Sequence, residues 1–182
     1  MIRVLAVLFA IMSAAPASAA PPVLPAGVDP QNTIVLDTSQ GRIIIKLHND
    51  IAPHHAERMK QLARDGFYDN VPFHRVIDGF MAQTGDGQNH NGTGGSKYSD
   101  LKAEFSGTPY VRGVVGMART SDPNSANSQF FIMFADGSFL NGKYTVVGQV
   151  VQGMEVVDKL HKGEPPANPD KIVHAYVAAD MK

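Results

Sequence analysis

Residues 73–85 read FHRVIDGFMAQTG, and this stretch has the pattern of two short strands joined by a turn. Residues 73–77 and 80–84 are rich in apolar and aromatic side chains, and the Asp78-Gly79 pair between them is typical of a turn. Two later stretches have the same character. They are GMARTSDPNSANSQFFIMF at 116–134 and FLNGKYTVVG at 139–148. Each places bulky apolar side chains around one or two polar ones, which makes these strings the best candidates for a functional site.

The pattern outside these strings predicts a mainly β protein with two helices. Residues 33–37 and 42–47 alternate around a turn and predict a hairpin. Residues 50–64 predict a helix, with Pro53 in its first turn and Gly66 just beyond its end. Many short strands with turn signals favour a sandwich or a barrel. The other predicted elements are strands at 111–118, 128–134, 144–150 and 172–178, a loop at 86–95 and a short helix at 153–160.

The strings FHR-x-I-x-GF-x-x-Q and N-S-Q-F-F-I resemble the cyclophilin family of peptidyl-prolyl isomerases. The form MARTSDPNSANSQFF is similar to the bacterial branch of that family. The resemblance spans residues 33–178, and we place the isomerase domain at 33–180. It implies a closed antiparallel eight-stranded β-barrel capped by two α-helices. It also implies an enzyme that isomerises X–Pro bonds in proline-containing, unfolded or partly folded polypeptides.

The resemblance also implies the residues of the site. Arg75 matches the catalytic arginine of the family. Gln83 matches a glutamine that helps to orient this arginine and the substrate carbonyl. We count Phe80 as catalytic, together with Arg75 and Gln83. Phe80 also belongs to an apolar cup for the proline ring. The remaining substrate-binding candidates are Met81, Phe131 and Leu140 in the cup, Ala118, Arg119 and Gln129 in a groove for the peptide backbone, and Phe139 and Tyr144 in one pocket wall.

The chemistry of X–Pro isomerisation suits these residue types. The C–N bond resists rotation because of resonance, and the barrier is about 18–20 kcal/mol. A cation that hydrogen-bonds the prolyl nitrogen weakens this resonance as the nitrogen becomes pyramidal. Arg75 can do this because arginine stays charged and presents a rigid fork of donors. No covalent step is needed, and we expect neither a metal nor another cofactor.

Three residues depart from the family pattern. Phe139 stands where many members have Trp, Tyr144 where many have His, and Arg119 where many have Asn. The first two keep one pocket wall aromatic, and the position of Arg119 acts largely through its backbone in the family. Phe139 and Tyr144 therefore bear on ligand preference more than on isomerase chemistry.

The first 19 residues have the order of a secretory signal peptide. Arg3 precedes an unbroken apolar run at 4–12, and the small-x-small sequence Ala17-Ser18-Ala19 follows. The run is shorter than the roughly 20 residues that span a bilayer. We therefore expect cleavage near Ala19, a periplasmic protein with no membrane attachment after processing, and a Pro-rich extended lead-in at 20–32.

Composition narrows the function classes further. The chain has 182 residues, with 16 Lys+Arg against 17 Asp+Glu, so it lacks the basic excess of a nucleic-acid binder. It has no Cys, which excludes disulfides and a cysteine nucleophile. Residues 137–143 fit most of a phosphate-binding loop, but Tyr144 follows where Ser or Thr is required. The seven His are scattered, and the stretch that begins at Asp86 lacks the Gly and Glu of a calcium loop.

Two functional hypotheses remain at this point. The first is a monomeric isomerase that acts on exported proteins. The second is a binding module, such as a proline-recognising chaperone or adhesion partner, in which turnover is incidental. The set of Arg75, Phe80, Gln83 and Phe131 favours the enzyme. The sequence does not identify the client proteins or the residue preferred before proline.

Overall fold

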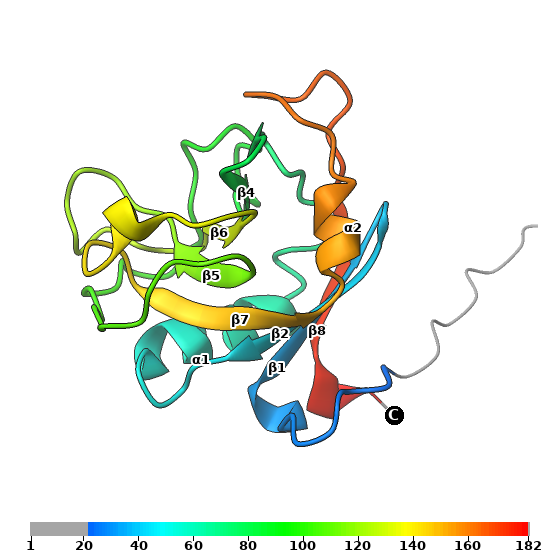
Figure 1. The fold of residues 1–182 in the computed structure, drawn as a ribbon, viewed down its shortest axis with the longest axis horizontal. Coiled ribbons are helices and arrows are strands. Elements are labelled where there is room, and N and C mark those ends of the chain that lie inside the picture. Colours follow the sequence, from blue (N-terminus) through cyan, green and yellow to red (C-terminus); the bar gives the residue numbers. More distant parts are fainter. Residues whose placement is uncertain (1–21, 182) are drawn as a thin grey trace, which may run out of the picture.

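Eight antiparallel strands form one curled sheet in the computed structural model, which describes residues 22–181 (Figure 1). The spatial order is β3-β4-β6-β5-β7-β2-β1-β8. The two helices pack on different strands, α1 mainly on β8 and α2 on β2. The bounds are β1 (Thr33–Thr38), β2 (Gly41–Leu47), α1 (Pro53–Arg64), β3 (Arg75–Ile77), β4 (Met81–Thr84), β5 (Val114–Met117), β6 (Phe130–Met133), β7 (Val146–Gln152), α2 (Met154–Asp158) and β8 (Ile172–Val177).

The predicted hairpin is confirmed as β1 and β2. Its turn is closed by the Thr38 hydroxyl, which donates to the Gly41 carbonyl at 2.7 Å. Gly41 has φ +134°, a conformation that side chains disfavour, and an added Cβ would lie 3.0 Å from Val156 of α2. Alternate residues of both strands, such as Leu36 and Ile43, are fully buried in the main core. The two-residue period of the sequence therefore indicated this core face correctly.

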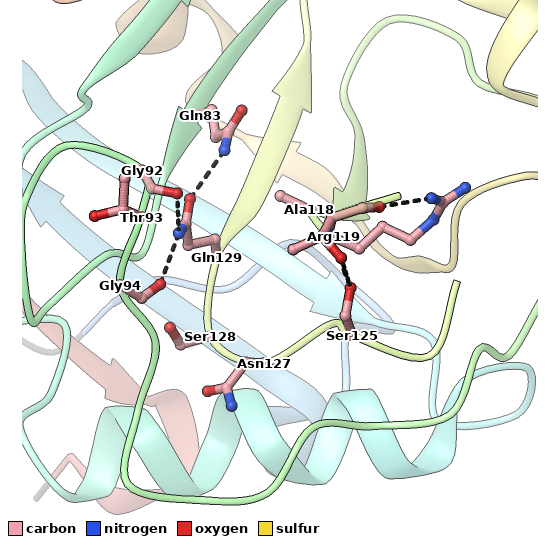
Figure 2. A pocket seen from close by; sticks show the side chains of 11 residues that line it. Gln83, Gly92, Thr93, Gly94, Ala118, Arg119, Ser125, Asn127, Ser128 and Gln129 are labelled. Carbon is pink, nitrogen blue, oxygen red and sulfur yellow. Dashed lines mark hydrogen bonds between the residues drawn. The ribbon is translucent and has the colours of Figure 1, made fainter. Parts of the chain in front are cut away.

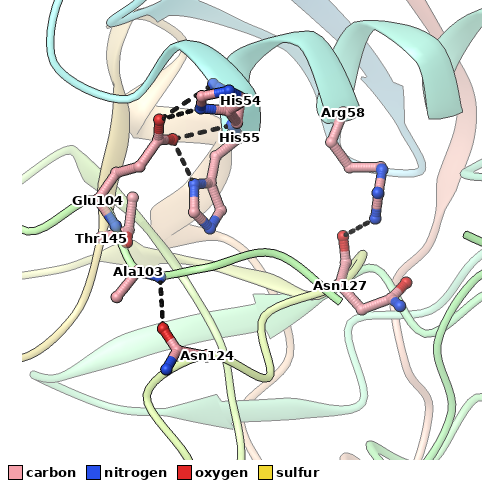
Figure 3. A network of polar contacts seen from close by, with 8 residues as sticks. All are labelled: His54, His55, Arg58, Ala103, Glu104, Asn124, Asn127 and Thr145. Atoms are coloured by element: carbon pink, nitrogen blue, oxygen red, sulfur yellow. Dashed lines mark hydrogen bonds and ion pairs between the residues drawn. The ribbon is translucent and has the colours of Figure 1, made fainter. Parts of the chain in front are cut away.

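Helix α1 begins at Pro53, three residues after the predicted start at 50. Its N-cap, Ala52, has no side chain that can accept a hydrogen bond. The carboxylate of Glu104 replaces this cap and accepts the backbone N–H groups of His54 and His55, at 3.2 and 3.1 Å (Figure 3). The same carboxylate contacts Nδ1 of both imidazoles, at 2.7 and 2.6 Å. A distant residue thus supplies the cap of a helix that begins at its own first-turn proline.

The predicted closed barrel is not confirmed, because the sheet is open between its edge strands β3 and β8. The segments just before β3 and β8 meet at an isolated bridge between Pro72 and Lys171. Pro72 has no N–H group to extend a ladder. The outer edge of β3 is also occupied, since Val76 exchanges both of its backbone hydrogen bonds with Gly163, each at 2.8 Å. The fold is therefore a half-barrel that a loop covers at one edge.

The shorter helix and the segment before β1 also differ in extent from the predictions. Helix α2 covers only Met154–Asp158 of the predicted 153–160. Within the predicted lead-in, Pro30–Asn32 form a 3-10 helix, because the Asp29 side chain accepts the Gln31 N–H at 3.0 Å. The predicted signal peptide at 1–19 lies outside the described residues. Among residues 22–181, no helix is long and apolar enough to cross a membrane.

Candidate functional site

The strands of the β3–β6 half bury side chains on both of their faces. On the inner face, Ala82, Phe130 and Ile132 belong to the main core. On the outer face, their neighbours Met81 and Phe131 belong to a second, smaller apolar cluster. Because strand side chains alternate, one short sequence supplies both clusters. The outer cluster forms the floor of the candidate site.

An apolar cavity of about 480 Å³ lies over this outer cluster. That volume is within the usual range of ligand pockets, roughly 300–1,000 Å³. The structure brings together here every predicted site residue except Gln129, which lines an adjacent cavity. The lining residues are Arg75, Phe80, Met81, Gln83, Ala118, Arg119, Phe131, Phe139, Leu140 and Tyr144. We call this hollow the apolar cavity.

Aromatic contacts hold the walls of the apolar cavity. Phe131 is buried and stacks on Tyr110, with ring centroids 5.7 Å apart. Tyr144 meets Phe131 edge-on, at 6.0 Å. At the rim, Phe139 is 59% exposed and contacts Phe80 at 5.5 Å. The floor is therefore rigidly packed, whereas the rim residue Phe139 is accessible to a ligand.

Arg75 begins β3 and reaches the apolar cavity from one side. Its Nε donates to Oε2 of Glu164 at 2.7 Å. Its register partner on β4 is Gln83, which was predicted to orient it. Gln83 instead donates from Nε2 to Oε1 of Gln129 at 2.9 Å. Sequence reasoning missed Glu164, because this residue lies in an irregular loop 89 positions away.

Gln129 links the site to the loop at 86–95, beside a second cavity of about 260 Å³ that is lined mainly by polar residues and glycines (Figure 2). Its Nε2 donates to the carbonyls of Gly92 and Gly94, at 2.9 and 2.8 Å. Its Oε1 accepts the bond from Gln83. Because both ends of the amide are bonded, the orientation of Gln129 is defined. The two cavities share Gln83, Ala118 and Arg119 in their linings and therefore adjoin each other.

Asp86 holds this loop in place. Its carboxylate is fully buried and accepts backbone N–H groups from Asn89, Asn91, Gly92 and Gly94, at distances of 2.8 to 3.1 Å. Burial alone would raise the pKa of Asp86, but these four donors outweigh it and lower the pKa to about 2. The aspartate that resembled a calcium ligand therefore organises the loop.

Two of the departures from the family pattern contact each other. The guanidinium of Arg119 lies 4.3 Å from the ring centroid of Tyr144, a cation–π contact. Its Nη1 donates to the carbonyl of Thr120 and its Nη2 to the carbonyl of Lys143, both at 2.8 Å. Arg119 therefore joins two loops at the border of the cavities. Among residues 22–181, no group of three or more His, Asp or Glu is placed to hold a metal ion.

Comparison with known proteins identifies the family. A family model described as cyclophilin type peptidyl-prolyl cis-trans isomerase/CLD matches residues 33–177. A probable peptidyl-prolyl cis-trans isomerase of Brucella suis is 55% identical over 169 residues, which cover 85% of this chain and 86% of that protein. A peptidyl-prolyl cis-trans isomerase of Acinetobacter baylyi is 43% identical over 136 residues, covering 71% and 72%.

Solved structures agree with this result. The cyclophilin AquaCyp293 from Hirschia baltica superposes with a TM-score of 0.79 at 31% identity, covering 85% of this chain and 77% of that one. A cyclophilin type isomerase of Cryptosporidium parvum, crystallised in the presence of the dipeptide Ala-Pro, gives a TM-score of 0.74 at 28% identity. The match covers 80% of this chain and 98% of that one. The chain belongs to the cyclophilin-type peptidyl-prolyl cis-trans isomerases.

Proposed function

We propose that this isomerase accelerates X–Pro isomerisation in exported proteins as they fold, and that it does so by stabilising the twisted amide without covalent chemistry. The observation that carries the mechanism is the position of Arg75 at the edge of the apolar cavity. Its Nε is bonded to Glu164, whereas its Nη groups have no hydrogen-bond partner among residues 22–181. A cation with free donors therefore borders an apolar cup.

The proposed mechanism assigns separate tasks to the two parts of the site. The apolar floor, with Met81, Phe131 and Leu140, excludes water from the proline ring. An Nη group of Arg75 donates to the prolyl nitrogen when rotation localises its lone pair. That interaction exists in the twisted state and is absent in the planar ground states, so it lowers the barrier. An acceleration of five decades corresponds to about 7 kcal/mol.

We propose that the client proteins are met in the periplasm, as unfolded or partly folded chains. The support is the sequence order of Arg3, the apolar run at 4–12 and Ala17-Ser18-Ala19. We also propose that the enzyme acts as a monomer. The large apolar side chains exposed among residues 22–181 come from separate segments of the chain, which favours this state. They are Val23, Phe105, Val111, Phe139 and Val173.

A protease-coupled prolyl-peptide assay on the mature protein tests the enzymatic proposal. Turnover should persist in EDTA and after thiol alkylation, because the proposed mechanism uses neither a metal nor a thiol. Peptide binding without turnover would favour the binding module instead. Cell fractionation with mass spectrometry tests export, and it should find protein without the leader in the periplasm. A cytosolic protein that retains Met1 would contradict export.

A further inference from the structure

The Arg75 side chain has a single anchor, which leaves its orientation dependent on one residue. Among residues 22–181, only Glu164 bonds to its guanidinium, through Nε and Oε2 at 2.7 Å. The neighbouring Gln83 is committed to Gln129. Arginine has four flexible side-chain torsions, and this one is 41% exposed, so packing alone does not fix it.

The backbone places Glu164 opposite Arg75. Val76 and Gly163 form an isolated antiparallel bridge and exchange both N–H···O bonds, each at 2.8 Å. In an antiparallel pair, the residue before one partner faces the residue after the other, and this next pair brings its side chains closer together. Arg75 precedes Val76, and Glu164 follows Gly163. The two charges are therefore paired by strand geometry.

Gly163 makes this bridge possible. Its φ is +148°, a region that other residues rarely adopt, and an added Cβ would lie 2.6 Å from the Pro166 Cα and 2.8 Å from the Pro165 carbonyl oxygen. A side chain at this position would force the loop away from β3. Glycine at position 163 therefore permits the loop conformation that places Glu164 next to Arg75.

We propose that Glu164 is a positioning residue for Arg75. This inference rests on the isomerase mechanism proposed above. The carboxylate holds the Nε edge of the guanidinium, so that the Nη edge is presented to the prolyl amide in advance. Such preorganisation lowers the cost of reaching the transition state. Both side chains of this ion pair are about half exposed, and exposed pairs contribute little to stability. Its expected effect is therefore on turnover rather than on folding.

Arg112 and Asp158 offer a control pair of similar exposure, joined by two hydrogen bonds where Arg75 and Glu164 have one. Nη2 of Arg112 lies 2.7 Å from Oδ2 of Asp158, with side-chain exposures of 47% and 46%. The corresponding values for Arg75 and Glu164 are 2.7 Å, 41% and 51%. Neither control residue lines the apolar cavity. If Glu164→Ala lowers turnover and Asp158→Ala does not, the loss comes from the missing anchor of Arg75 and not from the general loss of an exposed ion pair.

The experiment measures kcat and KM for Glu164→Ala, Glu164→Gln and Asp158→Ala in the prolyl-peptide assay. Glu164→Ala should lower kcat about fivefold, equivalent to about 1 kcal/mol, with KM nearly unchanged. Glu164→Gln should lose less, because its amide oxygen still accepts from Nε. Asp158→Ala should match the wild type. The Nε–Hε NMR signal of Arg75 should shift in both Glu164 variants and stay in place in Asp158→Ala.

A double-mutant cycle then asks whether Glu164 acts through Arg75. In an Arg75→Ala background, Glu164→Ala should cause no further loss. A further loss there, or equal activity of Glu164→Ala and Asp158→Ala, would overturn the positioning role while leaving the proposed function intact. If Glu164→Ala unfolds, the same comparison with Glu164→Gln decides. An inactive wild type would instead overturn the proposed function, and this inference with it.

Discussion

The two halves of the sheet are held together in different ways. Strands β1, β2, β7 and β8 are six or seven residues long, whereas β3 to β6 have only three or four. The long half carries longer ladders, with a register shift where β1 meets β8 and another where β2 meets β7, and it packs against both helices. In the short half, the chain spends most of its length in loops. Polar side chains connect these loops, as Gln129 does with Gly92 and Gly94.

This difference separates stability from function. Long ladders and buried aliphatic residues stabilise a frame that needs no particular side-chain chemistry. Short strands release loops whose polar groups then meet at one face, where the cavities lie. Binding residues often occupy loops that a rigid scaffold positions. Substitutions of core residues in the long half should therefore mainly lower stability, and substitutions of cavity residues in the short half should mainly lower turnover.

The largest expected effect is on turnover, from Arg75→Ala in the short half. Loss of a donor that acts mainly on the twisted amide should lower kcat/KM by two to three decades, or about 3–4 kcal/mol. Arg75→Lys should recover little, because a point charge does not reproduce the guanidinium fork. Kinetics and thermal melting of the same samples measure both properties. A much lower melting temperature in Arg75→Ala would assign the residue to the frame instead.

Asp86→Asn should affect both stability and the site, because this carboxylate organises a loop of the short half. The pKa of Asp86 is about 2, below its usual value of 3.8, so its ionised form stabilises the fold above pH 3.8. That contribution is lost as the pH falls from 3.8 towards 2. At neutral pH, Asp86→Asn should cost about 2 kcal/mol.

Urea unfolding at pH 7 and at pH 2.5 measures this effect. The wild type should lose stability between the two conditions by more than Asp86→Asn does, because the variant lacks the titrating group. Equal acid sensitivity of both proteins would mean that other carboxyl groups dominate acid unfolding.

Phe139→Trp should change inhibitor binding more than catalysis. The side chain lies at the exposed rim, where a Trp would add an indole N–H donor. An unsatisfied acceptor costs about 1–3 kcal/mol, so cyclosporin-type inhibitors should bind this variant about tenfold more tightly than the wild type. Peptide turnover should change only modestly, since the floor of the cavity is unaltered. Equally tight inhibition constants for both forms would contradict the role of the donor.

The smallest expected effect comes from Ile45→Val in the long half. Ile45 is fully buried in the main core, and loss of one methyl group there should lower the free energy of unfolding by about 1 kcal/mol. For a chain of this size, the melting temperature should fall by about 2–4 °C. Turnover should match the wild type. A clear loss of kcat would show that the two halves are coupled.

Much of this fold and site was predictable from local patterns. Alternation and turn residues placed the hairpin β1–β2 and the strands around the site, and the ordered strings indicated the residues of the apolar cavity. The ends of the strands and helices differ from the predicted ends by a few residues. Helix α1 starts at Pro53, a residue that suits the first turn, but its first N–H groups are capped by Glu104, about 50 positions away. Such a cap leaves no signal near the helix itself.

Sequence by itself determined which side chains face the two clusters, because the two-residue period of a strand is a local property. It also determined the residue types of the site, including the cation Arg75 and its apolar neighbours. Only the tertiary structure decided how these groups are oriented. Three contacts join segments that are distant in sequence. They are the bond between Gln83 and Gln129, the pairing of Arg75 with Glu164, and the bridge of Val76 with Gly163 at the edge of β3. Each depends on where the loops finally pack, and no local pattern records that outcome.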